Sequence, residues 1–118
     1  MELKNQVTYL ETSKKMAKLG FKQESLFYWI KMRDGSFRIQ YNPNKKSFAP
    51  VEEDLSAYTV AELGQFLPVY SSTLKETSNN IWQVKYDDIY FTESNLAEAM
   101  AKMLIHLLEQ KLMETPHD

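Results

Sequence analysis

The strongest constraint in this sequence is a hairpin pattern between residues 25 and 41. The segment 25–32 is aromatic and branched and has the length of a strand, which favours β-structure. Arg33, Asp34, Gly35 and Ser36 follow, and Asp-Gly is the strongest short-range signal for a hairpin turn. Apolar and polar residues then alternate over 37–41, as in a half-buried return strand. These signals predict an antiparallel hairpin, against which the other elements must pack.

Two segments begin with the spacing of a capping box, in which a Thr and a Glu three residues later satisfy the free amides of a first helical turn. The pairs are Thr8 with Glu11 and Thr59 with Glu62. They predict helices over 9–19 and 60–67, and Gly20 and Pro68 would end these helices.

Strands are predicted over 69–74, 81–86 and 89–91, because these segments are rich in branched and aromatic residues. Asp87-Asp88 would form the tight turn between the last two. The segment 42–54 is polar, contains Pro43 and Pro50, and is predicted to be a loop.

The segment 95–113 has a wide apolar stripe, from Leu96 to Leu112, and predicts a long last helix capped by Thr92 or Ser94. The predicted order is α-β-β-α-β-β(-β)-α. It indicates an α+β fold with two layers, in which this C-terminal helix packs on a small antiparallel sheet.

Composition narrows the function classes. The chain has 118 residues, 14 Lys+Arg against 16 Asp+Glu, and no cysteine. This length suits a single domain over 1–118, and the missing cysteine excludes disulfides, thiol nucleophiles and iron–sulfur clusters. No apolar run of signal-peptide length occurs near residue 1, and the densest apolar stretch, 97–108, is too short to span a membrane. We therefore expect a cytoplasmic protein with no membrane partner.

Three stretches resemble segments of a known group of proteins. They are 18–29 (KLGFKQESLFYW), 59–68 (TVAELGQFLP) and 99–109 (AMAKMLIHLLE). Together with their spacing, they resemble small uncharacterised proteins of bacteriophages and prophage-like elements, many from gut bacteria. The resemblance spans nearly the whole chain and implies a mobile-element origin, but it brings no activity, cofactor or catalytic residue.

No pattern predicts catalysis, a metal site or a cofactor. The histidines are His106, expected on the solvent side of the last helix, and His117 in the tail, and they lack metal-ligand spacing. Three scattered glycines cannot form a phosphate-binding loop. Asp87 and Asp88 are better explained by turn formation than by a cation site. We therefore expect a non-enzymatic protein. An enzyme would require a concave pocket with convergent carboxylates, or a Ser near His106.

One alternative function is nucleic-acid binding through a basic face of the first helix. The residues are Lys14, Lys15, Lys18 and Lys22. Such binding would weaken steeply with salt. Pairing of the lysines with Glu11 and the low number of arginines make it the less favoured hypothesis.

The favoured hypothesis rests on Phe27-Tyr28-Trp29, because three consecutive aromatics place at least one side chain on each face of a strand. Two interpretations remain open. Either both faces of this strand are covered by other elements, or one face is exposed as a surface for a protein partner. We expect a binding or accessory protein that acts through Phe27, Trp29, Arg33 and Arg38, with an unidentified protein or a second copy of the chain as partner.

Overall fold

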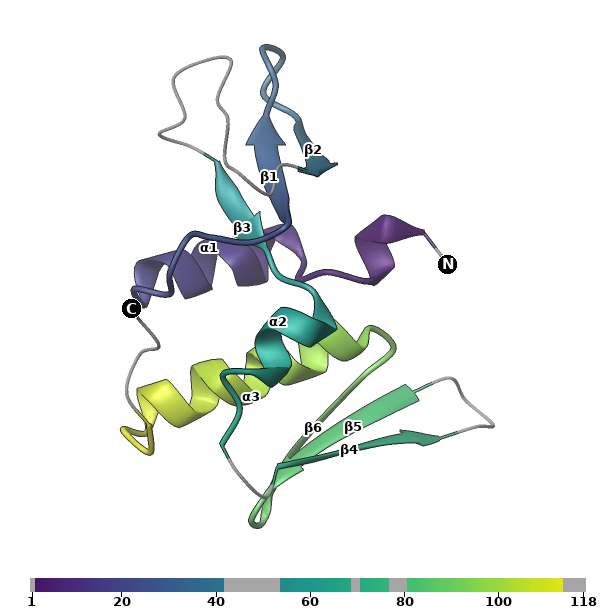
Figure 1. Cartoon of the computed structure of the whole chain (residues 1–118), viewed down its shortest axis with the longest axis vertical. Coiled ribbons are helices and arrows are strands. Elements are labelled where there is room, and N and C mark those ends of the chain that lie inside the picture. The colour runs from purple at the N-terminus through teal and green to yellow at the C-terminus, as the bar shows by residue number, and fades with distance from the viewer. Residues whose placement is uncertain (1, 42–53, 69–70, 77–80, 114–118) are drawn as a thin grey trace.

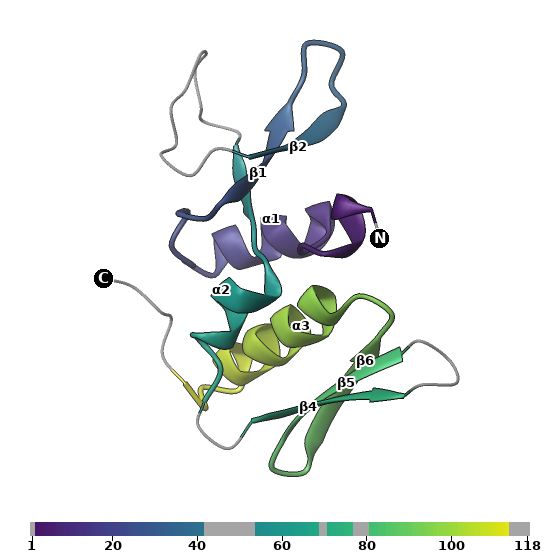
Figure 2. The ribbon, with the colours of Figure 1, turned by 45° about the vertical axis from the view of Figure 1, so that its right-hand side comes forward.

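The computed structural model describes residues 2–41, 54–68, 71–76 and 81–113, which form two three-stranded antiparallel sheets and three α-helices. Figures 1 and 2 show the helices lying between the two sheets. The predicted α+β class, with antiparallel strands and a long C-terminal helix packed on a sheet, is confirmed.

The first sheet contains the predicted hairpin, β1 (Phe27–Lys31) and β2 (Phe37–Tyr41), with Phe27 opposite Tyr41 and Trp29 opposite Ile39. Gly35 has a φ of 87° in the turn, a conformation that glycine adopts without steric penalty. The sheet has a third strand that the sequence pattern did not predict, β3 (Leu55–Ala57), which pairs with the other edge of β1.

The second sheet has the order β4-β5-β6, from β4 (Ser72–Glu76), β5 (Ile81–Tyr86) and β6 (Ile89–Glu93). Its inner face packs on the last helix, α3 (Leu96–Glu109). The sequence pointed to a small sheet, and the structure divides the strands between two sheets because helices separate them.

The other helices are α1 (Leu10–Lys18) and α2 (Val60–Gly64), preceded by a 3-10 turn, η1 (Leu3–Asn5). The capping box of Thr59 and Glu62 is confirmed at the start of α2. The predicted capping box of Thr8 and Glu11 is wrong. Tyr9 is the N-cap of α1 and makes no side-chain cap bond. The Thr8 hydroxyl is engaged instead by Ser13, at 2.7 Å, and by the amide of Tyr58, at 3.1 Å.

The main core lies where the three helices meet. Buried residues from α1, α2 and α3, including Met16, Leu63, Met100 and Leu104, form a cluster that extends to Val84 of β5. Among the described residues, no helix is both long and apolar enough to cross a membrane. Residues 42–53 of the loop predicted over 42–54 and the His117 tail lie outside the described residues.

Candidate functional site

A pocket of about 370 Å³ opens between the two sheets, and we call it the Phe27 pocket. It is bounded by segments from η1, β1, α2, β5 and the start of α3. Its walls are mainly apolar and include Leu3, Phe27, Val60, Ala61, Trp82 and Leu96. Residues that are distant in sequence therefore build one concave apolar surface, which is the usual character of a binding site.

Phe27 is the first residue of β1, and its ring lies 5.4 Å from the ring of Tyr41 in a tilted arrangement. The register explains this contact, because directly opposed residues of an antiparallel pair share a face. Phe27 is half-buried, whereas Tyr41 is 61% exposed. The aromatic surface of the first sheet thus continues into the pocket.

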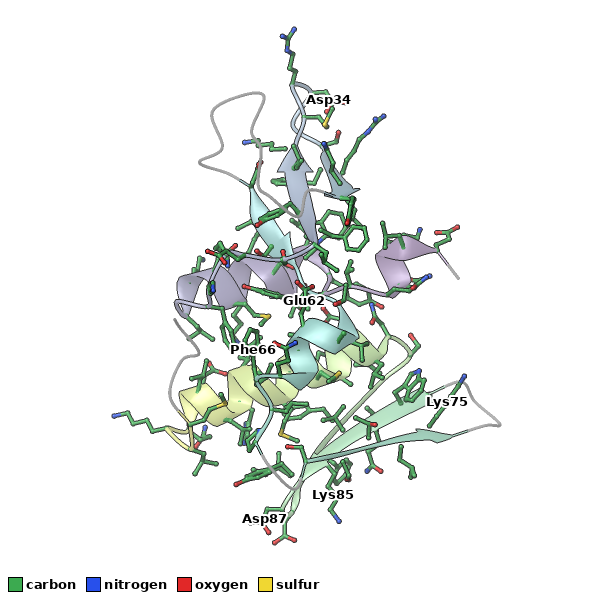
Figure 3. All side chains as sticks on the ribbon, in the orientation of Figure 1. Asp34, Glu62, Phe66, Lys75, Lys85 and Asp87 are labelled. Atoms are coloured by element: carbon green, nitrogen blue, oxygen red, sulfur yellow. The ribbon has the colours of Figure 1, made fainter. Side chains whose placement is uncertain are left out.

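The start of α2 is fixed by Glu62, whose carboxylate is close to the centre of the molecule (Figure 3). Its Oε1 accepts a hydrogen bond from the amide of Thr59 at 2.9 Å, and its Oε2 accepts one from the amide of Leu26 at 3.0 Å. One carboxylate therefore holds the first turn of α2 against the chain that leads into β1. This carboxylate thereby fixes the helical turn that contributes Val60 and Ala61 to the pocket wall.

The start of α3 is fixed by Asn95, which is buried. Its Oδ1 accepts a hydrogen bond from the amide of Glu98 at 3.3 Å, and its Nδ2 donates to the carbonyl of Val7 at 2.9 Å. Neither Thr92 nor Ser94 caps the helix, so that prediction is wrong: Asn95 is in the cap position and can also reach Val7. The same side chain therefore joins the segment after η1 to the start of α3, which forms part of the pocket wall.

Trp82 closes the pocket on the side of the second sheet. The Nζ of Lys75 lies 5.3 Å from the centroid of its ring, a cation–π distance. Figure 3 shows Lys75 at the end of β4, beside the described edge of that sheet. The pocket is therefore mainly apolar inside, and a cation lies against the ring of Trp82, one of its wall residues.

The four residues predicted to contact a partner do not form one patch. Phe27 and Trp29 share a face, both half-buried, and the Trp29 indole donates to the carbonyl of Thr8 at 3.0 Å. Arg38 pairs with Ile30 and so lies on the opposite face, while Arg33 is exposed in the turn. Tyr28, between the aromatics, is buried. At the base of the hairpin one face is thus buried at Tyr28 and the other is half-buried at Phe27 and Trp29, and Phe27 alone of the four lines the pocket.

The hairpin tip near these arginines contains Asp34 (Figure 3). Its Oδ1 accepts hydrogen bonds from the hydroxyl of Ser36 at 2.6 Å and from the amide of Ser36 at 2.9 Å. These bonds lower the pKa of the Asp34 carboxyl below its ordinary value. The turn is therefore ordered by its own side chains, as expected for an Asp-Gly hairpin.

The four lysines of the nucleic-acid hypothesis are largely occupied with neighbouring groups. Lys14 pairs with Glu11 at 3.3 Å, Lys15 with Glu109 at 3.6 Å, and Lys22 with Glu24 at 3.1 Å. Lys14 also lies 5.6 Å from the ring of Phe37. Lys18 is exposed. Carboxylates beside three of the four cations reduce the attraction that a phosphate backbone would feel.

His106 lines a second pocket, of about 340 Å³, between α1 and α3. It was expected on the solvent side of the helix, but it is half-buried with its ring 5.6 Å from that of Phe91, because β6 runs beside this flank of α3. The pocket's carboxylates, Glu11 and Glu109, are paired with Lys14 and Lys15. Within the described part of the chain, no three His, Cys, Asp or Glu side chains could hold a metal ion.

The pocket residues Leu3, Val60 and Trp82 were not identified as functional from the sequence. The alternation of Trp82 with Val84 and Tyr86 placed all three on one face of a strand, and the register confirms this. No pattern indicated that the η1 segment lies beside that face.

Comparisons with protein-family models, curated proteins and solved structures find no match to this chain.

Proposed function

We propose that this chain is a non-catalytic binding protein that engages a protein partner through the Phe27 pocket, as an accessory protein of a phage or prophage-like element. The resemblance of the three sequence stretches supports the mobile-element origin. The pocket supports the binding role. The observation that carries this role is the position of Phe27, whose ring belongs both to the pocket wall and to the aromatic pair with Tyr41.

The pocket is suited to an apolar side chain. Its volume of about 370 Å³ is at the lower end of the range of about 300–1,000 Å³ for small-molecule sites. Asn5, Gln6 and Ser94 also line it. The side chains of Thr59 and Asn95 already form the caps of α2 and α3. They are therefore poorly placed to orient a polar ligand. One or two apolar side chains of a partner match this combination of size and lining.

The surroundings of the pocket resemble the rest of an interface. Exposed apolar side chains border it, with Leu3 at 37% exposure in η1 and Tyr41 at 61% in β2. A buried anchor surrounded by such contacts is the usual arrangement of a binding hot spot. The Lys75 ammonium lies against Trp82, a wall residue, so a partner that reaches past this ring is expected to place a carboxylate there.

A photo-crosslinking amino acid placed at position 61 tests the proposal. Ala61 lines the pocket and is exposed, so the probe reaches a docked side chain. The control position is Gln110, which is exposed at the far end of α3. In the cells that make the protein, we expect one discrete adduct with a second protein from position 61 and not from position 110.

The captured partner must then be purified and bound in isolation. Leu3→Asp, which changes a half-exposed side chain outside the core, is expected to weaken this binding about 10-fold. Identical adducts from both positions, or equal affinity of wild type and Leu3→Asp for the purified partner, would rule out the pocket as the docking site.

A further inference from the structure

The tip of the first hairpin contains the pair Asp34-Gly35. Both residues are exposed, and Figure 3 shows Asp34 at the outer end of the molecule. The other glycines, Gly20 and Gly64, each follow a leucine, so Asp34 is the one Asp or Asn of the sequence that precedes glycine. This pair is both a turn signal and a chemically reactive unit, and it lies outside the Phe27 pocket.

An aspartate before glycine can rearrange its own backbone. The amide nitrogen of the glycine attacks the side-chain carbonyl carbon, so an N–Cγ bond forms, the C–OH bond breaks, and the amide proton leaves with the hydroxyl as water. Water then adds to either carbonyl of the five-membered imide. One product is aspartate, and the other is isoaspartate, whose main chain runs through the former side chain. Glycine favours the attack because it has no Cβ to hinder it.

We propose that Asp34 is a site of this isomerisation, and that the folded turn suppresses the reaction until the hairpin tip opens. The attacking nitrogen is held by backbone hydrogen bonds. The amide of Gly35 donates to the carbonyl of Met32 at 3.0 Å, and the amide of Met32 donates to the carbonyl of Ser36 at 2.7 Å. Because ring closure turns the Gly35 nitrogen toward the Asp34 side chain, the bond to Met32 must break first.

The carboxyl group under attack is held as well. Its Oδ1 accepts hydrogen bonds from the hydroxyl of Ser36 at 2.6 Å and from the amide of Ser36 at 2.9 Å, which direct it toward Ser36. These bonds, with a smaller contribution from Arg38, lower the pKa of the Asp34 carboxyl and keep it ionised. The ionised form is the less reactive one, because the attack expels hydroxyl from the neutral acid.

The rate of isomerisation should therefore follow the fraction of molecules whose tip is open. When opening and closing are faster than the reaction, that fraction multiplies the rate of the open chain. Residues 31–36 are all exposed and outside the core cluster, so the tip can open while the core stays folded. The Phe27–Tyr41 pair is at the other end of the hairpin, so this proposal and the Phe27 pocket are independent and either can fail alone.

Incubation of the purified chain, followed by proteolysis and electron-transfer mass spectrometry, measures isoaspartate at Asp34. In urea concentrated enough to unfold the chain, isoaspartate should form there at least about 10-fold faster than in the native protein at the same pH and temperature. Asp88 is the internal control, because it is also exposed in a turn but precedes the branched Ile89. Asp88 should remain aspartate under both conditions.

Ser36→Ala tests the role of the turn. The variant loses the hydroxyl bond to Asp34, so its native form should isomerise at least about 3-fold faster than the wild type, and the amide of Gly35 should exchange with solvent faster. In urea the two chains should react at similar rates. Ser94→Ala, at an exposed position outside the turn, is the matched control and should react like the wild type.

Circular dichroism checks that both variants fold. Three results would overturn the proposal: native wild type that reacts as fast as the unfolded chain, equal native rates in the two variants, or a lack of isoaspartate at Asp34 in urea.

Discussion

The carboxylate of Glu98 in α3 accepts a hydrogen bond from the backbone amide of Tyr9, at 2.6 Å and across 89 residues of sequence. Its other oxygen accepts one from the hydroxyl of Thr12 at 2.8 Å. Tyr9 is the N-cap of α1, so a buried side chain of the last helix satisfies one free amide at the start of the first helix, as well as the Thr12 hydroxyl. The contact joins two helices through a group that usually acts within one helix.

We expect Glu98→Ala to lower the free energy of unfolding by about 2–3 kcal/mol, because two donors lose a charged acceptor. Urea titration followed by circular dichroism measures the change. Glu109→Ala is the matched control on the same helix, since its pair with Lys15 is exposed and should contribute no more than about 1 kcal/mol. Equal losses in the two variants would contradict the role given to Glu98.

The pH dependence of stability should contain a contribution from the same carboxyl. Burial is the largest influence on Glu98 and raises its pKa above the ordinary 4.5, against the smaller opposing effects of Tyr9, Thr12 and Lys102. The folded state then binds the proton more tightly than the unfolded chain. Stability from this group is therefore greatest at low pH and decreases as the pH rises from 4.5 through the raised value.

Comparison with Glu98→Gln isolates this contribution, because glutamine does not titrate. The free energy of unfolding of the wild type minus that of the variant should decrease as the pH rises above 4.5, because the folded-state pKa of Glu98 is raised. Urea titrations at several pH values give the difference. A difference that increases with pH would mean that the carboxyl is stabilised in its charged form.

Asn95→Ala should destabilise the protein by about 1–3 kcal/mol, because it removes the cap of α3 and the bond to Val7 together. Asn95→Ser keeps a cap but cannot reach Val7, so we expect a smaller loss. Ser94→Ala, at the exposed neighbouring position, is the control and should be nearly neutral. Thermal unfolding midpoints of the three variants rank them, and a Ser variant as unstable as Ala would show that the Val7 bond is the main contribution.

Two glycine substitutions should act in opposite directions. Gly35 has a φ of 87°, and nothing lies within 4 Å of an added Cβ, so Gly35→Ala is expected to destabilise by about 1 kcal/mol through the backbone alone. Gly64 is helical, and an added Cβ would contact Met100 at an ordinary 3.5 Å. Gly64→Ala should therefore stabilise by about 0.5–1 kcal/mol. Chemical denaturation measures both, and changes of the same sign would refute the backbone argument.

The local features of the fold were predictable because neighbouring residues determine them. The Asp34-Gly35 turn and the box of Thr59 with Glu62 contain their own hydrogen-bond partners within four residues. The same type of signal misled at Thr8, because the hydroxyl there bonds to Tyr58, which lies 50 residues away. Sequence periodicity gives no information about a partner at that distance.

The candidate site was predicted only in part for a similar reason. Phe27 was predicted to contact a partner and it lines the pocket, but its role in binding stays a prediction. Trp82 and Leu3 line the same pocket as Phe27 because the helices lie between the two sheets and set their relative positions. Sequence periodicity does not indicate that arrangement. The three-residue strand β3 was missed since it is too short to show alternation.

The segment at residues 7–9 has its partners far along the chain. The amide of Thr8 donates a hydrogen bond to the carbonyl of Tyr58 at 3.0 Å, and the carbonyl of Val7 accepts one from the side chain of Asn95. A ribosome must therefore synthesise the chain past residue 95 before this segment can be fully paired. Until then the hairpin and the contacts of Thr8 with Trp29 and Tyr58 can form, but α1 lacks its attachment to α3. Packing of α1 on α3 is thus a late event that follows synthesis of the chain up to α3.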